Sequence, residues 1–117
     1  MIRSLGRLLL AGIFISGGAD AFLKPGGRVD KVAAAGLPEP KQSVELNGLA
    51  MVIGGTLLGL GLAPKLAASL LLICLLPTTV VGHAFWKEES EAVRKGQMTQ
   101  FYKNLGLLGG LLLVLSE

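Results

Sequence analysis

Four polar side chains could share chemistry although they are far apart in the chain: Asp20, Glu45, His83 and Asn104. A carboxylate and an imidazole can exchange a proton, and a carboxamide can both donate and accept hydrogen bonds. Imidazole suits proton exchange because its charge changes near neutral pH. Since His83 is the only histidine, the common zinc sites with several histidines are not expected, and we predict no bound metal.

The elements that must position these residues are four apolar blocks separated by charged segments. Hydrophobic residues make up 51% of the 117-residue chain and charged residues 16%, whereas soluble domains carry about 25% charged residues. The blocks cover residues 5–22, 44–62, 66–86 and 101–115. Because a membrane helix needs about 20 mostly apolar residues, we predict one all-α domain over residues 1–117. It is expected to be a four-helix transmembrane bundle with antiparallel up-down topology.

The first block has a second interpretation. Arg3 and Arg7 precede its apolar run and the small-residue sequence "ADA" follows it, as in a secretory signal peptide. We expect the block to be retained as a membrane helix. Pro25 and the two glycines after it are expected to end this helix.

The connections between the blocks alternate between long and short. Residues 23–43 and 87–100 form long connections, and only residues 63–65 join the second block to the third. We expect residues 28–38 to form a short interfacial helix, Pro38 and Pro40 to force extended chain, and residues 87–100 to form a charged turn of helix. Both long connections then lie on one side of the membrane, and both chain ends lie on the other.

This topology predicts a polar pocket on the long-connection side. Asp20, Glu45, His83 and Asn104 all fall at that end of their helices, and charged groups survive in a bilayer by facing the bundle interior and pairing. Pro77, with Thr78 and Thr79, is expected to open the third helix, so that the freed backbone carbonyls and the threonine hydroxyls are available to the same cavity.

Simpler interpretations of the same residues stay open. Ser16, one turn before Asp20, is a further pocket candidate, but Asp20 could instead form an ion pair with Lys24 or Lys103. His83 could be an ordinary interfacial residue, as the neighbouring aromatic residues are expected to be. Two glycine pairs spaced by four residues, at 55 and 59 and at 106 and 110, favour close helix packing within the bundle.

The chain resembles the DoxX family of small bacterial membrane proteins. The resemblance rests on "FISGGADAFLKP", "GLPEP", "VELNGLAMVIGGTLLGLG", "GHAFW" and "FYKNLGLLGGLLLV", in this order. It implies a four-helix bundle in the bacterial inner (plasma) membrane, and Glu45, His83 and Asn104 match polar positions of the family pattern. It also implies a link to redox chemistry, since some relatives are associated with thiosulfate:quinone oxidoreductase or with complexes that handle thiol and oxidative stress. Distant relatives act as cargo receptors or assembly chaperones.

Two functions from different classes are compatible with these features. We favour a redox-associated, quinone- or thiol-linked membrane subunit that has no built-in cofactor and binds a quinone or another small amphiphile. The alternative is a structural or assembly subunit of a larger membrane complex, without activity of its own; a small transporter is a weaker third hypothesis. The sequence does not decide whether the protein is an enzyme.

The expected partners are the lipid bilayer and other membrane subunits. Nucleic acid is not expected, because the basic residues are dispersed and no aromatic-interleaved basic patch exists. Eight of the eleven lysines and arginines lie on the long-connection side, which favours the cytoplasm for that side. Arg3 and Arg7 favour a cytoplasmic N-terminus instead, so the orientation stays open.

Overall fold

The computed structural model describes residues 1–117 and consists of helices without a strand. The helices are α1 (Ile2–Leu23), α2 (Gly26–Ala34), α3 (Pro40–Leu60), α4 (Pro64–Pro77) and α5 (Glu91–Leu115). A π-helical segment, η1 (Thr78–Gly82), continues α4, and a short 3-10 turn, η2 (Phe85–Lys87), precedes α5.

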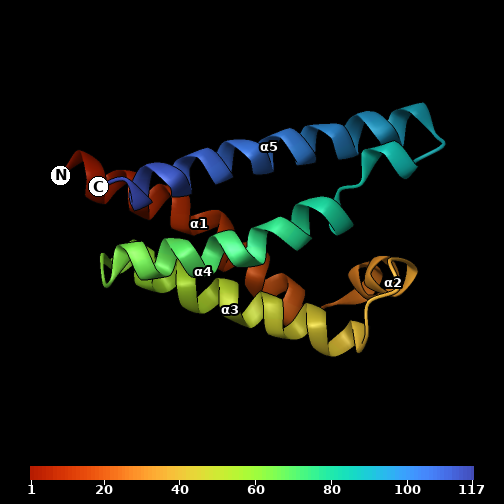
Figure 1. Ribbon diagram of the computed structural model, residues 1–117, viewed down its shortest axis with the longest axis horizontal. Helices are drawn as coiled ribbons and strands as arrows, with labels where there is room; N and C mark the ends of the chain where they lie inside the picture. Colours follow the sequence, from red (N-terminus) through yellow and green to blue (C-terminus); the bar gives the residue numbers. More distant parts are fainter.

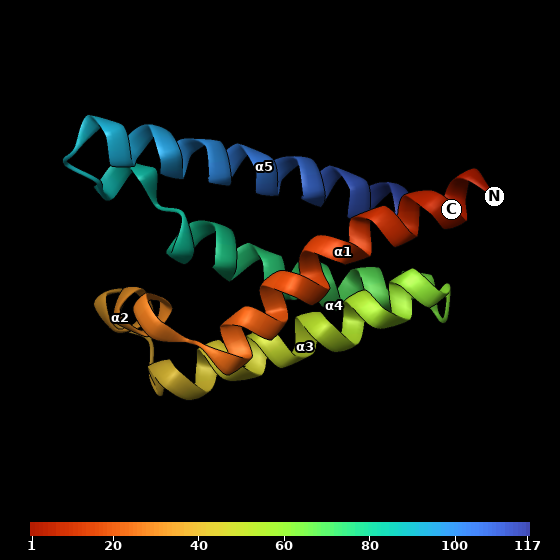
Figure 2. The same cartoon turned by 180° about the vertical axis from the view of Figure 1, so that it is seen from behind.

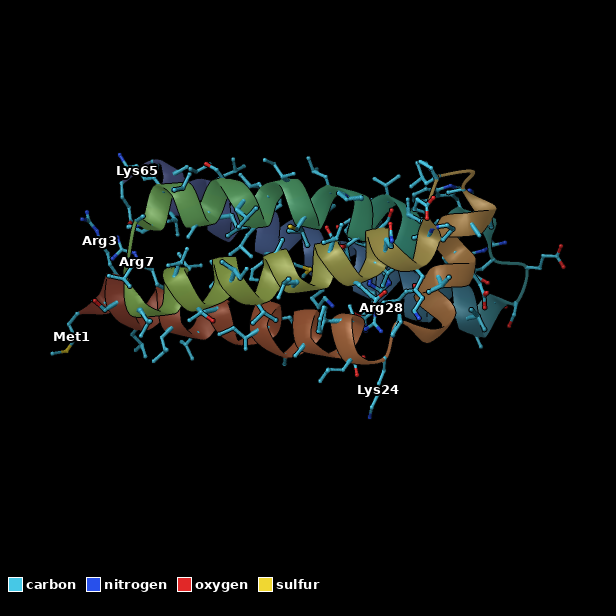
Figure 3. The ribbon with its side chains drawn as sticks, turned by 90° about the horizontal axis from the view of Figure 1, so that it is seen from below. Met1, Arg3, Arg7, Lys24, Arg28 and Lys65 are labelled. Carbon is cyan, nitrogen blue, oxygen red and sulfur yellow. The ribbon has the colours of Figure 1, made fainter.

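The two ends of the molecule carry different connections. The N-terminus, the C-terminus and the α3–α4 turn lie at one end, and α2 lies at the other (Figure 1, Figure 2). The labelled basic side chains follow the same division, with Arg3, Arg7 and Lys65 at the first end and Lys24 and Arg28 towards the second (Figure 3). Residues from both long connections therefore lie away from the chain ends.

Three helical segments are long and apolar enough to cross a membrane: Ile2–Leu23, Pro40–Leu60 and Pro64–Lys87. The first half of α5 is polar, and its uninterrupted apolar part, residues 105–115, rises only about 16 Å against a hydrocarbon core of about 30 Å. The all-helical membrane fold is thus present with three candidate spans, and the fourth span of the predicted bundle stays a prediction.

Most helix ends follow from local sequence, with two exceptions. α1 ends at Leu23, just before Pro25, and the predicted interfacial helix is present as α2. The extended chain predicted around Pro40 is wrong, because Pro40 is the first residue of α3. Proline is tolerated at this position, since the backbone N–H that it lacks would have no partner within the helix. The fourth apolar block covers only residues 101–115, but α5 begins at Glu91, where the Ser90 side chain accepts a hydrogen bond from the backbone N–H of Val93.

α1 and α3 touch through two glycines. A Cβ on Gly48 would lie 2.6 Å from the Gly18 carbonyl oxygen, and a Cβ on Gly18 would lie 2.6 Å from the Gly48 carbonyl oxygen. Gly55 and Gly59 also face α1, as predicted for packing within the bundle, whereas a Cβ on Gly106 would meet no atom within 4 Å. The Gly18–Gly48 contact therefore sets how closely these two helices approach.

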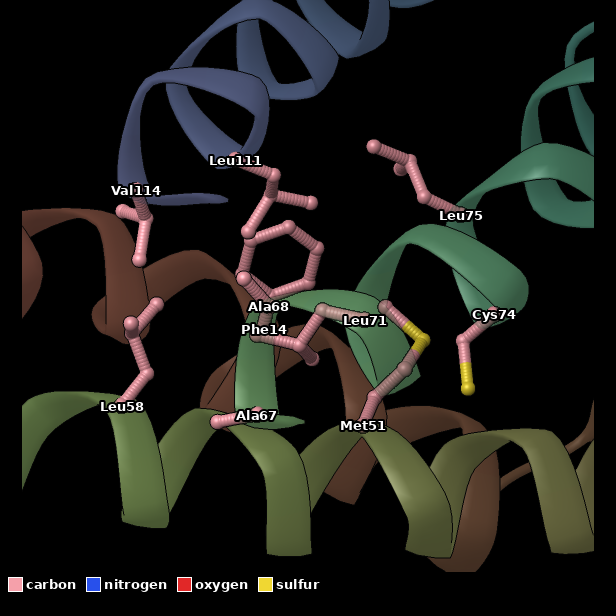
Figure 4. Close-up of a cluster of buried hydrophobic side chains, with 10 residues drawn as sticks. All are labelled: Phe14, Met51, Leu58, Ala67, Ala68, Leu71, Cys74, Leu75, Leu111 and Val114. Atoms are coloured by element: carbon pink, nitrogen blue, oxygen red, sulfur yellow. The ribbon is translucent and has the colours of Figure 1, made fainter. Parts of the chain in front are cut away.

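The core joins all four long helices. Phe14 of α1, Leu58 of α3, Leu71 of α4 and Leu111 of α5 are the largest fully buried side chains and lie in one cluster (Figure 4). Large apolar side chains also cover the outside, including Leu9, Ile53, Leu66, Ile73 and Leu113. An exposed apolar surface of this extent fits contact with lipid rather than with water.

An ion pair between Arg7 and Glu117 ties the start of α1 to the end of the chain. Both side chains are only 19% exposed, and Arg7 Nε is buried without a partner. We expect Glu117→Gln to lower the thermal midpoint in detergent, because it leaves the guanidinium without its counter-charge. Adding Arg7→Met should recover part of the loss; a double variant less stable than Glu117→Gln alone would contradict this expectation.

Candidate ligand cavity

A cavity of about 870 Å³ lies among the helices and is lined by residues from α1 to α5. Its volume is within the range of roughly 300–1,000 Å³ seen for small-molecule sites. Fifteen of its 27 lining residues are hydrophobic, so the cavity suits a ligand that is mostly apolar. The polar residues among the other lining residues are the groups that could bind the polar head of such a ligand.

The π-helical segment after α4 supplies one polar wall. Pro77 has no backbone N–H, so the regular helical ladder is interrupted there, and π-segments within helices often occur at functional sites. Thr78 Oγ1 donates to the Cys74 carbonyl (2.9 Å) and accepts from Asn47 Nδ2 of α3 (3.0 Å). The predicted opening of the helix at Pro77 therefore exists, and Thr78 lines the cavity, whereas Thr79, also predicted to face it, does not.

A second pair of hydrogen bonds links α5 to the same segment. Thr79 Oγ1 donates to the Leu75 carbonyl (2.7 Å) and accepts from Asn104 Nδ2 (3.0 Å). Thr79 and Asn104 are the two buried polar residues of the chain. The Thr78 and Thr79 hydroxyls each donate their hydrogen to a backbone carbonyl, so Asn47 and Asn104 must be the donors in the bonds to these hydroxyls. The Oδ1 atoms of both carboxamides can therefore still accept hydrogen bonds.

His83 lies on the cavity wall and is held by α5. Its Nδ1 is 2.8 Å from Gln97 Oε1. Because an amide oxygen only accepts, Nδ1 carries the proton in this arrangement, and Nε2 is left with no partner in the protein. Phe85 and Phe101 pack edge to face at 5.3 Å beside this pair, which holds η2 against α5.

The structure brings two of the four predicted site residues into one cavity and leaves two outside. His83 and Asn104 line the cavity, whereas Asp20 and Glu45 do not. Asp20 is exposed and pairs with Arg28 (2.9 Å), not with Lys24 or Lys103 as the sequence suggested. Glu45 is half-buried on α3, beside the cavity wall rather than in it.

Helix geometry explains why Glu45 is outside, because at about 100° per residue it is about 160° from Asn47 and about 140° from Ala50, two residues of α3 that line the cavity. Asp20 is only about 60° from Gly17, which also lines the cavity. It therefore lies at the edge of that face of α1, and its exposed carboxylate pairs with Arg28 instead. Ser16 does not line the cavity either, and its hydroxyl bonds only to the Ile13 carbonyl.

The predicted pocket did not include several further lining residues that carry polar or charged side chains, among them Arg28, Lys31, Asn47 and Lys103. Asn47 could have been found from periodicity, because it lies between Val44 and Met51 at the i+3 and i+4 spacings of one helix face. The two basic residues of α2 have no such pattern in the sequence. They reach the cavity because α2 folds back, with Lys31 Nζ donating to the Gly82 carbonyl of η1 (2.7 Å).

Comparisons with known proteins identify the family. The DoxX family model matches residues 2–84, which run from α1 past the π-helical segment to the residue after His83. The inner membrane protein YphA of Escherichia coli (strain K12) is 29% identical over 110 residues, which cover 94% of this chain and 78% of the relative. No solved structure matches the chain. The chain therefore belongs to the DoxX family, and it is a multi-pass protein of the bacterial inner membrane.

Proposed function

We propose that this DoxX protein is a redox-linked membrane subunit that binds a small amphiphile, with a quinone as the candidate ligand, in the cavity between its helices. The observation that carries the proposal is the largely apolar cavity of about 870 Å³ with the carboxamides and imidazole of Asn47, Asn104 and His83 on its wall. Few polar groups in an otherwise apolar cavity are typical of sites that bind and orient a small molecule.

The polar groups suit the head of a quinone. Its ring and chain are apolar, and its carbonyl oxygens accept hydrogen bonds. Asn104 has a second amide hydrogen beyond the one given to Thr79, and His83 Nε2 can carry a proton when the ring is charged. A bound quinone would supply the redox chemistry, while these residues would orient its head and exchange protons with it.

In this proposal α5 is the fourth transmembrane helix of an antiparallel bundle. Its apolar half contributes Leu111 and Val114 to the core, and Asn104 and Leu107 line the cavity. Its first turns, with Glu91 and Lys95 paired at 3.6 Å, would lie among the headgroups, because charged side chains are far less costly there than in the hydrocarbon core.

Binding of a short-chain ubiquinone analogue to the purified protein tests the proposal. We expect saturable binding that His83→Ala and Asn104→Leu each weaken by about three- to tenfold, the effect of losing one hydrogen bond of about 1 kcal/mol. Glu45→Ala is the matched control, since Glu45 does not line the cavity, and its affinity should equal that of the native protein.

Two results would count against this function. Absence of saturable binding would remove the amphiphile site altogether. An equal loss of affinity in Glu45→Ala would show that the cavity is not where the quinone binds. If a stoichiometric partner co-purified from native membranes while no ligand bound, the structural or assembly alternative would replace the proposal.

A further inference from the structure

We propose that the cavity selects amphiphiles whose head carries a negative charge, such as a carboxylate or a phosphate monoester. The proposal rests on the proposed function only in that an amphiphile enters the cavity. It is carried by the charge of the lining: Arg28, Lys31, His83 and Lys103 are its basic residues, and no aspartate or glutamate lines it.

Composition alone does not impose this one-sided lining, because the chain has eight acidic residues as well as eleven lysines and arginines. The basic residues also come from separate elements, because Arg28 and Lys31 belong to α2, His83 follows η1 and Lys103 belongs to α5. The fold therefore gathers basic groups around one cavity from distant parts of the sequence.

The two lysines have no counter-ion in the protein. Lys31 Nζ donates to the Gly82 carbonyl (2.7 Å) and Lys103 Nζ to Gln100 Oε1 (2.6 Å), and both acceptors are neutral. Neither lysine belongs to any of the three ion pairs of the chain. Since an ammonium has three donors, each lysine keeps two for a ligand.

Arg28 is only partly compensated. Its Nη2 is 2.9 Å from Asp20 Oδ2, but both side chains are about half exposed, at 45% and 54%, so solvent screens this pair. The cavity mouth thus carries net positive charge beside an apolar interior. An anionic head would gain charge-assisted hydrogen bonds, which are roughly twice as strong as neutral ones, and its chain would lie against apolar residues such as Phe14, Ala50 and Met51.

Three probes with the same chain length test the charge preference in zwitterionic phosphatidylcholine nanodiscs. We expect dodecanoate and dodecyl phosphate to bind at least about tenfold more tightly than methyl dodecanoate, which has no charge. Lys31→Gln and Lys103→Gln should each weaken the anionic probes by about three- to tenfold and leave the ester unchanged. Lys95→Gln is the control, because Lys95 lies on the same helix as Lys103 but not in the cavity lining.

The outcomes separate this inference from the proposed function. If the ester and dodecanoate bound equally, charge selection would be overturned while an amphiphile site remained. If none of the amphiphiles bound, including the quinone, the proposed function would fail as well. If inorganic phosphate displaced dodecanoate with the same potency as dodecyl phosphate, the lysines would bind free anions and the inference would be wrong. If replacing phosphatidylcholine by anionic phosphatidylglycerol removed the preference for charged probes, the lysines would be contacts for lipid headgroups and the inference would also be wrong.

Discussion

Gly48→Ala is expected to push α1 and α3 apart and to lower the thermal midpoint of the protein in detergent. The new methyl group would lie 2.6 Å from the Gly18 carbonyl oxygen and 2.9 Å from the Phe22 backbone nitrogen. Both are backbone atoms, so no side chain can rotate away and a whole helix must move. Overpacking of this kind costs about 1–3 kcal/mol, which exceeds the gain of up to about 1 kcal/mol from replacing glycine by alanine within a helix.

The same substitution should also weaken ligand binding. Asn47 precedes Gly48 in α3, and its hydrogen bond to Thr78 (3.0 Å) depends on the distance between α3 and the segment that follows α4. Displacing α3 would therefore disturb the polar wall of the cavity as well as the core. We expect the loss of stability and the loss of quinone affinity to occur together in this variant.

Gly12→Ala in α1 is the matched control for the packing effect. A Cβ at Gly12 meets no atom within 4 Å, so this variant gains the same helix propensity without a clash and should melt at or above the native midpoint. Gly18→Ala should behave like Gly48→Ala, because its Cβ meets the Gly48 carbonyl oxygen at 2.6 Å. If Gly48→Ala and Gly12→Ala had the same midpoint, the close helix contact would be refuted.

The apolar blocks predicted the membrane helices well because hydrophobic length is a local property of the sequence. The helix end before Pro25 and the opening at Pro77 were predictable for the same reason, since proline acts on its own turn of helix. The bounds of α5 were not predictable in this way. Its polar first turns and its apolar end form one continuous helix, whereas hydropathy identifies only the apolar end.

The candidate site was predicted less well because it depends on rotation of each helix about its axis. Placing polar residues at helix ends put His83 and Asn104 in the lining of one cavity, but it gave no information about which face of its helix each residue occupies. Glu45 lies on the face of α3 away from the lining residues, and Asp20 is turned outward in its pair with Arg28. The lysine contributed by α2 was not predictable, because the docking of α2 on η1 through Lys31 and Gly82 is a tertiary contact without a sequence pattern.

Gly17→Phe is expected to weaken ligand binding strongly without unfolding the protein. Gly17 lines the cavity, yet a Cβ at this position meets no atom within 4 Å, so a large side chain can be accommodated by occupying the open space. A phenyl group there would take volume that the ligand needs. We expect the affinities for the quinone and for dodecanoate to fall by more than about tenfold, which corresponds to about 1.4 kcal/mol, with a thermal midpoint close to native.

Gly12→Phe separates a blocked cavity from a general effect of a larger side chain on α1. Gly12 has the same open surroundings within 4 Å but does not line the cavity, so its variant should bind both ligands normally. Because Gly17 contributes no polar group, the loss in Gly17→Phe must come from occupied volume and not from a missing hydrogen bond or charge. Native affinity in Gly17→Phe would therefore place the ligand outside the cavity, whichever head group the ligand carries.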